Sequence, residues 1–372
     1  MTRLPVPLWL TAPTRYARLT RGQARIAFVA LLAVLAISLS ALLSPAPPKI
    51  HHNATARSDD RADIVLYESI VAGVRGGGNY YLVAADAHRT GHYPLRPFVT
   101  VRLPTLATVQ AALPRLVSVG LLYALALGTF SAWFFRLRPA FSRTPPRIVA
   151  LGLLAGGMMA FVQSELVAFH EIWAGLLIAL SLAAWRPGRW IEAVALALCA
   201  VLIRETAALY LIVMGALALV EGRRREALGW AVAIVVLGVA VALHAHAVAQ
   251  VVSSRDLHSQ GWAGMLGFGF FVRTMTISTS LMLAPLWLSA PLVALALFGW
   301  SAWNDPTGLR ALATFGVYGL LISLFGRVDT FYWGLLVAPA FLVGLAFVPD
   351  AIREIGYRLV DKRRITVTKK VQ

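Results

Sequence analysis

Three carboxylates gather near the start of the chain, in the stretch RSDDRADIVLYESIVAGVRGGGNYY that covers residues 57–81. They are Asp59, Asp60 and Asp63, three of only 17 acidic residues in a chain of 372. On a helical wheel of about 100° per residue, Asp63 falls in the middle of the apolar face formed by the residues that follow it. Because burying a carboxylate there without a partner is costly, Asp63 is a candidate for ligand binding or for general base catalysis.

Helix capping explains the same acids in a second way. Asp60 can cap the start of a helix while Asp63, three residues later, bonds back to it, and acidic residues are favoured at the positive end of a helix. Asp59 and Asp60 are then expected to be capping and solvated residues. The sequence leaves both explanations of Asp63 open. The glycines of RGGGNYY end this helix, and since no strand precedes them they do not form a nucleotide phosphate loop.

A second polar group lies in FVQSELVAFHEIWAG, which contains Glu165, His170 and Glu171. This stretch is a predicted outer turn between two apolar segments, so its side chains either face water or join a site with Asp63. The spacing is a poor metal signature, because Glu165 is the only further ligand nearby and no His-x-x-x-His motif occurs. We expect no cofactor; a divalent cation is optional, but the sequence offers no convincing metal site.

Arginines are the candidate ligands for a phosphate group, which they bind by forked, charge-assisted hydrogen bonds. Each can instead extend its charge to the membrane surface or pair with an acid. Arg204 in LIRET is the foremost candidate, because its predicted helix is too short to deliver the side chain to water, although Glu205 beside it can neutralise the charge. The candidates near the predicted outer face are Arg96, Arg102, Arg204, Arg273 and Arg327.

Membrane helices must position these groups. The chain is 59% hydrophobic and 14% charged, with a mean hydropathy of +0.71, which excludes an ordinary soluble domain. Recurring apolar segments predict an all-α, polytopic transmembrane bundle of about ten helices, with an amphipathic membrane-surface helix in the first outer loop. The predicted membrane helices lie near 26–43, 116–135, 148–168, 171–185, 190–204, 206–220, 227–247, 275–300, 311–326 and 331–349.

The chain is predicted to form one integral-membrane domain over residues 1–372. Its parts are a cytoplasmic N-terminus at 1–25, a first membrane helix at 26–43, a large outer loop at 44–114, the remaining helices at 115–349 and a basic cytoplasmic tail at 350–372. The net charge is +17, and Lys and Arg concentrate in the segments that this scheme places inside, so both ends are expected in the cytoplasm. The charge indicates contact with membrane lipids rather than nucleic acid, since no basic stripe interleaved with aromatic residues occurs.

The segment 190–220 must cross the membrane twice if the basic sequences RPGR and EGRRRE are to lie on the same side. Each pass then has about 15 residues, or about 22 Å, which is less than the ~30 Å hydrocarbon core. We predict this short hairpin rather than one long helix. It places Arg204 and Glu205 below the outer interface, where they line a cavity or pair, because exposure to lipid is costly.

The pattern RADIVLYESI…GNYY…HYPLRPFVTVRLP resembles the first outer loop of the GT-C superfamily of membrane glycosyltransferases. The resemblance covers the topology of the whole chain, and motifs only in this loop and near HEIWAG. In that family a membrane-surface helix carries a key Asp, tyrosines and a proline-rich return follow, and acids lie at the outer end of a later helix pair. The resemblance implies Asp63 and Glu171 as the catalytic carboxylates, with Glu165 a weaker choice for the second. The further pocket candidates are Tyr67, Tyr80, Tyr81, His170 and Glu165.

The resemblance implies transfer of a sugar from a polyprenyl-phosphate donor to an acceptor on the outer face of a bacterial cytoplasmic (inner) membrane. The acceptor is an unknown glycan, lipid or protein. Asp63 would be the base in a single inverting displacement, with arginines stabilising the phosphate that leaves. The alternative is a transporter or flippase for an envelope precursor, with Arg204, Glu205 and Glu165 along its path. A third option is a non-catalytic scaffold for envelope synthesis.

Overall fold

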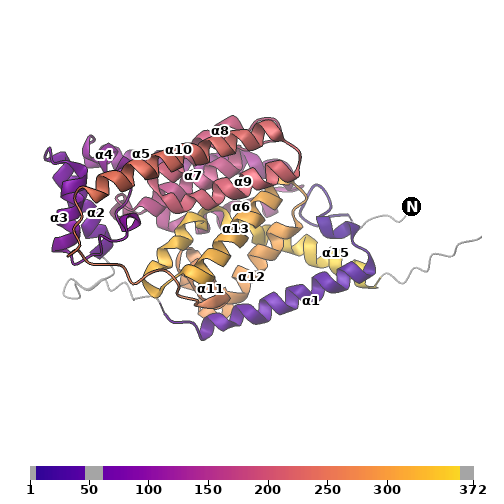
Figure 1. The fold of residues 1–372 in the computed structure, drawn as a ribbon. Helices are drawn as coiled ribbons and strands as arrows, with labels where there is room; N and C mark the ends of the chain where they lie inside the picture. Colours follow the sequence, from indigo (N-terminus) through magenta and orange to yellow (C-terminus); the bar gives the residue numbers. More distant parts are fainter. Residues whose placement is uncertain (1–5, 47–61, 361–372) are drawn as a thin grey trace, which may run out of the picture.

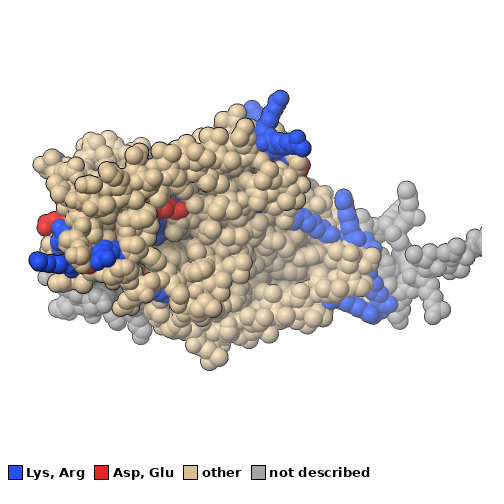
Figure 2. Space-filling view, viewed as in Figure 1, with Lys and Arg blue, Asp and Glu red and all other residues tan. Residues whose placement is uncertain are grey.

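The computed structural model describes residues 6–46 and 62–360, and within these ranges every regular element is a helix. Most of the helices run along the length of an elongated bundle (Figure 1). Basic side chains gather at the two ends of the bundle, and the flank between them is largely uncharged (Figure 2). This distribution is typical of a protein whose apolar flank faces lipid.

Within residues 6–46 and 62–360, four helices are long and apolar enough to cross a membrane. They are α1 (Arg21–Ser38), which continues into η2 (Leu39–Leu42), α5 (Arg115–Leu137), α10 (Arg224–Ala249) and α13 (Pro306–Phe325). Most side chains of α1, α5 and α10 are not buried inside the protein, as lipid-facing helices require. The chain is therefore an all-helical, multi-pass membrane protein, as the sequence predicts.

Shorter apolar helices complete the bundle. They are α7 (His170–Ala184), α8 (Ile191–Ile203), α9 (Ala208–Val220) and α12 (Leu286–Ala302), and α7 is the most deeply buried of them. Trp185, just after α7, hydrogen-bonds to Glu226 at the start of α10 (2.7 Å), whereas Arg204 bonds to Glu171 at the opposite end of α7. The chain between these points therefore runs back along α8 and forward along α9, so the segment is a helical hairpin rather than one long helix. That each of its helices crosses the membrane stays a prediction.

Three expected membrane helices are interrupted. The helix expected over 148–168 is α6 (Thr144–Gly157), which ends where a Cβ atom on Gly157 would lie 2.6 Å from the carbonyl oxygen of Pro339. The helix expected over 275–300 is split into α11 (Gly267–Ile277), η8 (Ser280–Leu283) and α12, with Pro285 ahead of the last of these. The number of membrane crossings stays a prediction.

The last expected span, over 331–349, consists of short pieces. They are η9 (Val328–Leu336), α14 (Ala338–Phe341), η10 (Leu342–Phe347) and α15 (Val348–Val360), and the axis bends by 64° after η9. Gly344 packs against the carbonyl of Ala296 on α12 so closely that a Cβ atom would meet it at 2.1 Å. Trp300 on α12 donates to the carbonyl of Phe341 at 2.9 Å, which places the aromatic core at this junction.

The segment expected to be the first outer loop folds into a helical cap at one end of the bundle (Figure 1). It contains α2 (Ala62–Arg75), α3 (Tyr80–Thr90), η3 (Phe98–Thr100) and α4 (Thr105–Ala111). The apolar face predicted for 63–74 is confirmed, because Leu66, Tyr67, Ile70 and Val71 are buried, but that face packs against α3 and α4. The predicted capping residues Asp59 and Asp60 lie outside the described residues.

The N-terminal segment and α15 lie together at the other end of the bundle (Figure 1). The backbone amides of Trp9 and Leu10 donate to the Asp350 carboxylate at 2.9 and 3.0 Å, and the amide of Thr14 donates to Glu354. Residues 350–360, which we assigned to a basic tail, thus belong to a packed helix that holds the N-terminal segment. The remainder of that expected tail, 361–372, lies outside the described residues.

Candidate functional site

Arg204 is buried at the break between α8 and α9. Its backbone is extended (φ −141°, ψ 110°), which ends α8 and begins the short turn η7 (Glu205–Ala207). Nε donates to Oε1 of Glu171 at 2.5 Å, and Nη1 donates to Oε2 of Glu205 at 2.9 Å. Because α8 and α9 are only 13 residues each, about 20 Å, this ion pair lies deeper than the outer ends of α5 and α10.

Arg102 reaches the same carboxylate from the cap. Its Nε donates to the hydroxyl of Tyr67 at 3.1 Å, and its Nη2 lies 3.9 Å from Oε1 of Glu171. Tyr80 donates its hydroxyl proton to the carbonyl of Arg102 at 2.6 Å, and the next amide, of Leu103, donates to Glu205 at 3.2 Å. The cap is therefore tied to the bundle through this group, which we call the outer cluster: Asp63, Arg102, Glu171, Arg204 and Glu205.

Asp63 lies one turn before Tyr67 and is the member of the outer cluster that α2 contributes. Burial raises the pKa of its carboxyl, and the positive charge of Arg102 and a hydrogen bond from Tyr93 oppose this rise. The negative charges of Glu171 and Asp329 add to it. A carboxylate with a raised pKa is a stronger base than an ordinary aspartate, which is the property that general base catalysis needs.

The two arginines of the outer cluster differ in what they have left to bind. Arg204 is committed to two carboxylates. Arg102 donates one side-chain hydrogen bond, and within residues 6–46 and 62–360 its two terminal nitrogens have none. Its side chain is 11% exposed, against 5% for Arg204. Arg102, rather than the Arg204 that the sequence favours, is the arginine with donors available for an anion.

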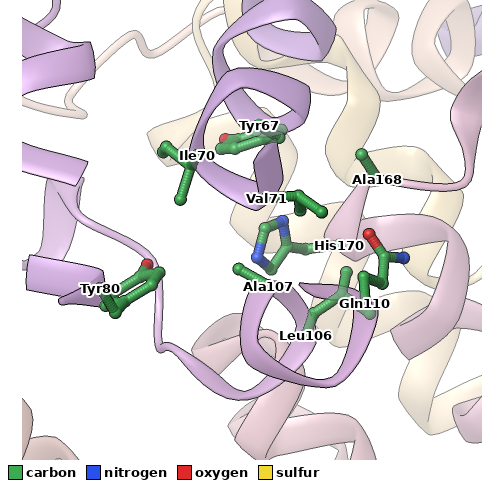
Figure 3. A pocket seen from close by; sticks show the side chains of 9 residues that line it. All are labelled: Tyr67, Ile70, Val71, Tyr80, Leu106, Ala107, Gln110, Ala168 and His170. Atoms are coloured by element: carbon green, nitrogen blue, oxygen red, sulfur yellow. The ribbon is translucent and has the colours of Figure 1, made fainter. Parts of the chain in front are cut away.

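His170 begins α7 and is buried against Tyr67, with ring centroids 4.8 Å apart. Among the described residues, neither ring nitrogen of His170 has a hydrogen-bond partner, and the same is true of Oε2 of Glu171. The imidazole lines a small cavity between α2, α4 and the start of α7 (Figure 3). The residues around this cavity are Tyr67, Ile70, Val71, Tyr80, Leu106, Ala107, Gln110, Ala168 and His170.

The remaining predicted site residues lie elsewhere. Arg96 donates to the carbonyl of Ser254 at 3.0 Å and holds the cap to the connection between α10 and α11. Arg327 pairs with Asp329 at 2.6 Å at the border of the outer cluster. Tyr81 contacts His244 of α10, whose ring in turn bonds to the carbonyl of Val101.

Two further candidates are also separate from the outer cluster. Glu165 is exposed in the turn η6 (Ser164–Leu166), away from the buried carboxylate of Glu171. Arg273 on α11 donates to the carbonyls of Ala41 and Ser44, and thereby caps the end of the first membrane helix.

Two tyrosines near the outer cluster are not among the site residues that the sequence predicts. Tyr93 bonds to Asp63 from the loop after α3, and Tyr332 in η9 is electrostatically coupled to Arg102 and Arg204. Tyr93 lies 30 residues from Asp63 and Tyr332 lies in the last quarter of the chain, so no periodicity connects them with α2. Only the motif HYPLRP, which belongs to the quoted resemblance, could have pointed to Tyr93.

Over the parts of the chain that the structure describes, no group of three or more His, Cys, Asp or Glu side chains could hold a metal ion. Comparison with protein-family models, with curated proteins and with solved structures finds no match to this chain. What the site does must therefore be argued from its residues.

Proposed function

We propose that this protein is a membrane glycosyltransferase, which transfers a sugar from a polyprenyl-phosphate donor to a hydroxyl-bearing acceptor at the outer end of the bundle. The observation that carries the proposal is the convergence of Asp63, Glu171, Arg102 and Arg204 from four separate segments. A base and an arginine with free donors are the groups that such a transfer needs, and Glu171 would hold the arginines in place. The bacterial inner membrane and the cytoplasmic position of both ends belong to the same proposal.

The reaction would proceed by one displacement. Asp63 takes the proton of an acceptor hydroxyl as its oxygen attacks the anomeric carbon of the sugar. The bond from that carbon to the phosphate oxygen breaks, and its electron pair leaves with the polyprenyl phosphate. Because phosphate is a good leaving group, no acid catalyst is required, and the second carboxylate, Glu171, is free to hold the arginines instead.

Arg102 would stabilise the phosphate as it leaves. Its planar guanidinium can offer two parallel donors to a phosphate, a geometry that lysine lacks. Glu171 and the stack on Tyr67, 5.9 Å from the guanidinium carbon to the ring centroid, hold Arg102 in place. Arg204 supports this arrangement by fixing Glu171 through the shared oxygen Oε1.

A donor with a long lipid tail needs access from the side of the bundle. Glu205 is the most exposed of the residues that pair with Arg204, with a side chain that is 21% exposed. Acidic and basic atoms interrupt the uncharged flank near the cap (Figure 2). Short α8 and α9 lower the site toward the membrane, where the phosphate of a lipid-linked donor lies.

The test compares Asp63→Asn with Glu68→Gln. Glu68 is on the opposite face of the same helix, where it pairs with Arg115 at 2.6 Å, so it is a matched acid away from the site. Membranes containing each variant are given a radiolabelled polyprenyl-phosphate sugar, and labelled product is counted. Asp63→Asn should lose transfer and Glu68→Gln should keep it; full activity in Asp63→Asn would remove Asp63 from the chemistry.

A further inference from the structure

His170 is the exception among the polar groups around the cavity of Figure 3. Tyr80 donates to the carbonyl of Arg102, Gln110 donates to the carbonyl of Val167 at 2.6 Å, and Tyr67 accepts from Arg102. The imidazole is only 3% exposed, yet the described residues offer no partner to either of its nitrogens. Since a buried polar group without a partner is destabilising, proteins rarely keep one that neither water nor a ligand satisfies.

The chemistry of the cavity selects a neutral partner. A neutral imidazole presents one N–H donor and one nitrogen acceptor, which a hydroxyl group can meet in both roles. A cation would be repelled by Arg102 and Arg204, which both act on His170 electrostatically. An anion would be buried among Ile70, Val71 and other apolar side chains, at a high desolvation cost.

The size of the cavity limits the partner to one small group. Its volume is about 10 Å³, which is room for one water molecule or one hydroxyl. The cavity shares a wall with the outer cluster, because Tyr67 both lines it and accepts a hydrogen bond from Arg102. A hydroxyl held by His170 therefore lies beside the site where Asp63 would act.

We infer that the His170 cavity is a subsite for one neutral hydroxyl group of the acceptor, which it positions next to the hydroxyl that Asp63 deprotonates. The inference rests on the proposed transfer reaction and adds the class of acceptor: a neutral polyol, such as a sugar, rather than an amine or a phosphate. His170 is a positioning residue in this scheme. In its absence the acceptor binds more weakly, while the binding of the donor is unchanged.

Three probes that share one alkyl chain test the class of acceptor: hexyl β-D-glucoside, hexyl phosphate and hexylamine. Full-length protein in membranes receives the labelled donor together with each probe. We expect labelled product from the glucoside alone. In His170→Phe the KM for hexyl glucoside should rise about tenfold, as expected for a lost hydrogen bond, with the KM for the donor unchanged. His170→Gln, which keeps a donor and an acceptor, should restore most of the affinity.

The outcomes separate the subsite from the reaction. Product from hexyl phosphate or hexylamine, no product from any probe, or an unchanged KM for hexyl glucoside in His170→Phe would overturn the subsite. If Asp63→Asn keeps full transfer, the proposed mechanism falls, while the subsite is still judged by the KM in His170→Phe. If water alone fills the cavity, both His170 variants keep the wild-type KM, which also overturns the subsite.

Folding is controlled separately. His170 has no hydrogen bond to lose among the described residues, so the unfolding midpoint of His170→Phe should be no lower than that of the wild type. His88→Phe is the comparison, because His88 is equally buried but its Nδ1 is bonded to the carbonyl of Pro94 at 3.0 Å. If kcat and the unfolding midpoint of His170→Phe fall together, His170 has a structural role and the subsite is overturned.

Discussion

In the part of the chain that the structure describes, two arginine clusters lie at opposite ends of α7. The outer cluster contains Arg102 and Arg204. The inner cluster contains Arg310, Arg223, Glu221 and Glu226, together with Trp185 and Trp230. Arg310 contacts Glu221 through both terminal nitrogens and lies over the ring of Trp185, 3.6 Å from its centroid.

The two clusters differ in how completely their hydrogen bonds are made. All four carboxylate oxygens of Glu221 and Glu226 have partners, and among the buried side-chain atoms of this cluster in the described residues only Nε of Arg310 lacks one. At the outer end, Oε2 of Glu171 and both nitrogens of His170 have no hydrogen-bond partner in the described chain. The terminal nitrogens of Arg102 donate no hydrogen bond there, and Nη2 is only 3.9 Å from Glu171 in an ion pair. A network whose hydrogen bonds are all made holds helices together, whereas unsatisfied donors and acceptors beside a cavity are available to a ligand. The comparison predicts that stability depends on the inner cluster and activity on the outer one.

The largest expected effect on stability is at Arg310. Arg310→Ala leaves Glu221 with one partner and removes the cation from the face of Trp185, so the free energy of unfolding should fall by about 3–5 kcal/mol. Thermal or denaturant unfolding of purified protein in detergent measures this. Arg102→Ala is the control from the outer cluster, and an equal loss there would erase the distinction between the two clusters.

The largest expected effect on activity is at Asp63. Removing a general base lowers the rate of transfer by about 10²–10⁴-fold, so Asp63→Asn should retain at most about 1% of the wild-type turnover. The amide has nearly the same shape, and the unfolding midpoint should not fall. If turnover and midpoint decline together, Asp63 has a structural role instead.

Arg102 should matter most for the donor. Arg102→Ala removes charge-assisted donors worth about 1.5–3 kcal/mol, which predicts an increase of about 10- to 100-fold in the KM for the labelled donor. Arg102→Lys should recover only part of this, because an ammonium cannot form the two parallel bonds. If the KM for the donor changes in Arg204→Lys but not in Arg102→Ala, then Arg204 rather than Arg102 binds the donor.

The pH dependence of stability should report the burial of Asp63. Its pKa is raised in the folded protein, so the neutral form is favoured and stability is lost as pH rises from the ordinary aspartate pKa through the raised value. Asp63→Asn stays neutral throughout and escapes this loss. Unfolding midpoints of the two proteins, measured from pH 4 to pH 8, should therefore diverge in favour of the variant as pH rises; parallel curves would contradict the burial.

The smallest effects are expected outside both clusters. Glu165 is exposed, and Arg89 pairs with Asp256 in the cap connection with a side chain that is 45% exposed. Glu165→Gln should leave transfer unchanged, and Arg89→Ala should cost at most about 1 kcal/mol of stability, as exposed ion pairs do. A large loss of activity in Glu165→Gln would make it, not Glu171, the second carboxylate.

Local sequence patterns predict much of the architecture. The apolar face around Asp63 follows from helical periodicity alone, and its burial of Leu66 and Ile70 agrees. The hairpin at Arg204 follows from the basic sequences on either side of it and the limited length between them. The interrupted helices could not be predicted, because the end of α6 and the packing of η10 depend on glycines that meet distant carbonyls.

The sequence by itself determined that this is a helical membrane protein with polar groups at one end, because apolar length and charge asymmetry are local properties of the chain. Tertiary structure alone decided that Arg102 shares Glu171 with Arg204, that Glu165 stands apart and that His170 is left without a partner. Arg102 and Glu171 are 69 residues apart in sequence. Their contact depends on how the cap packs against the ends of α7 and α8. No pattern within either segment encodes that contact, since it arises from packing between them.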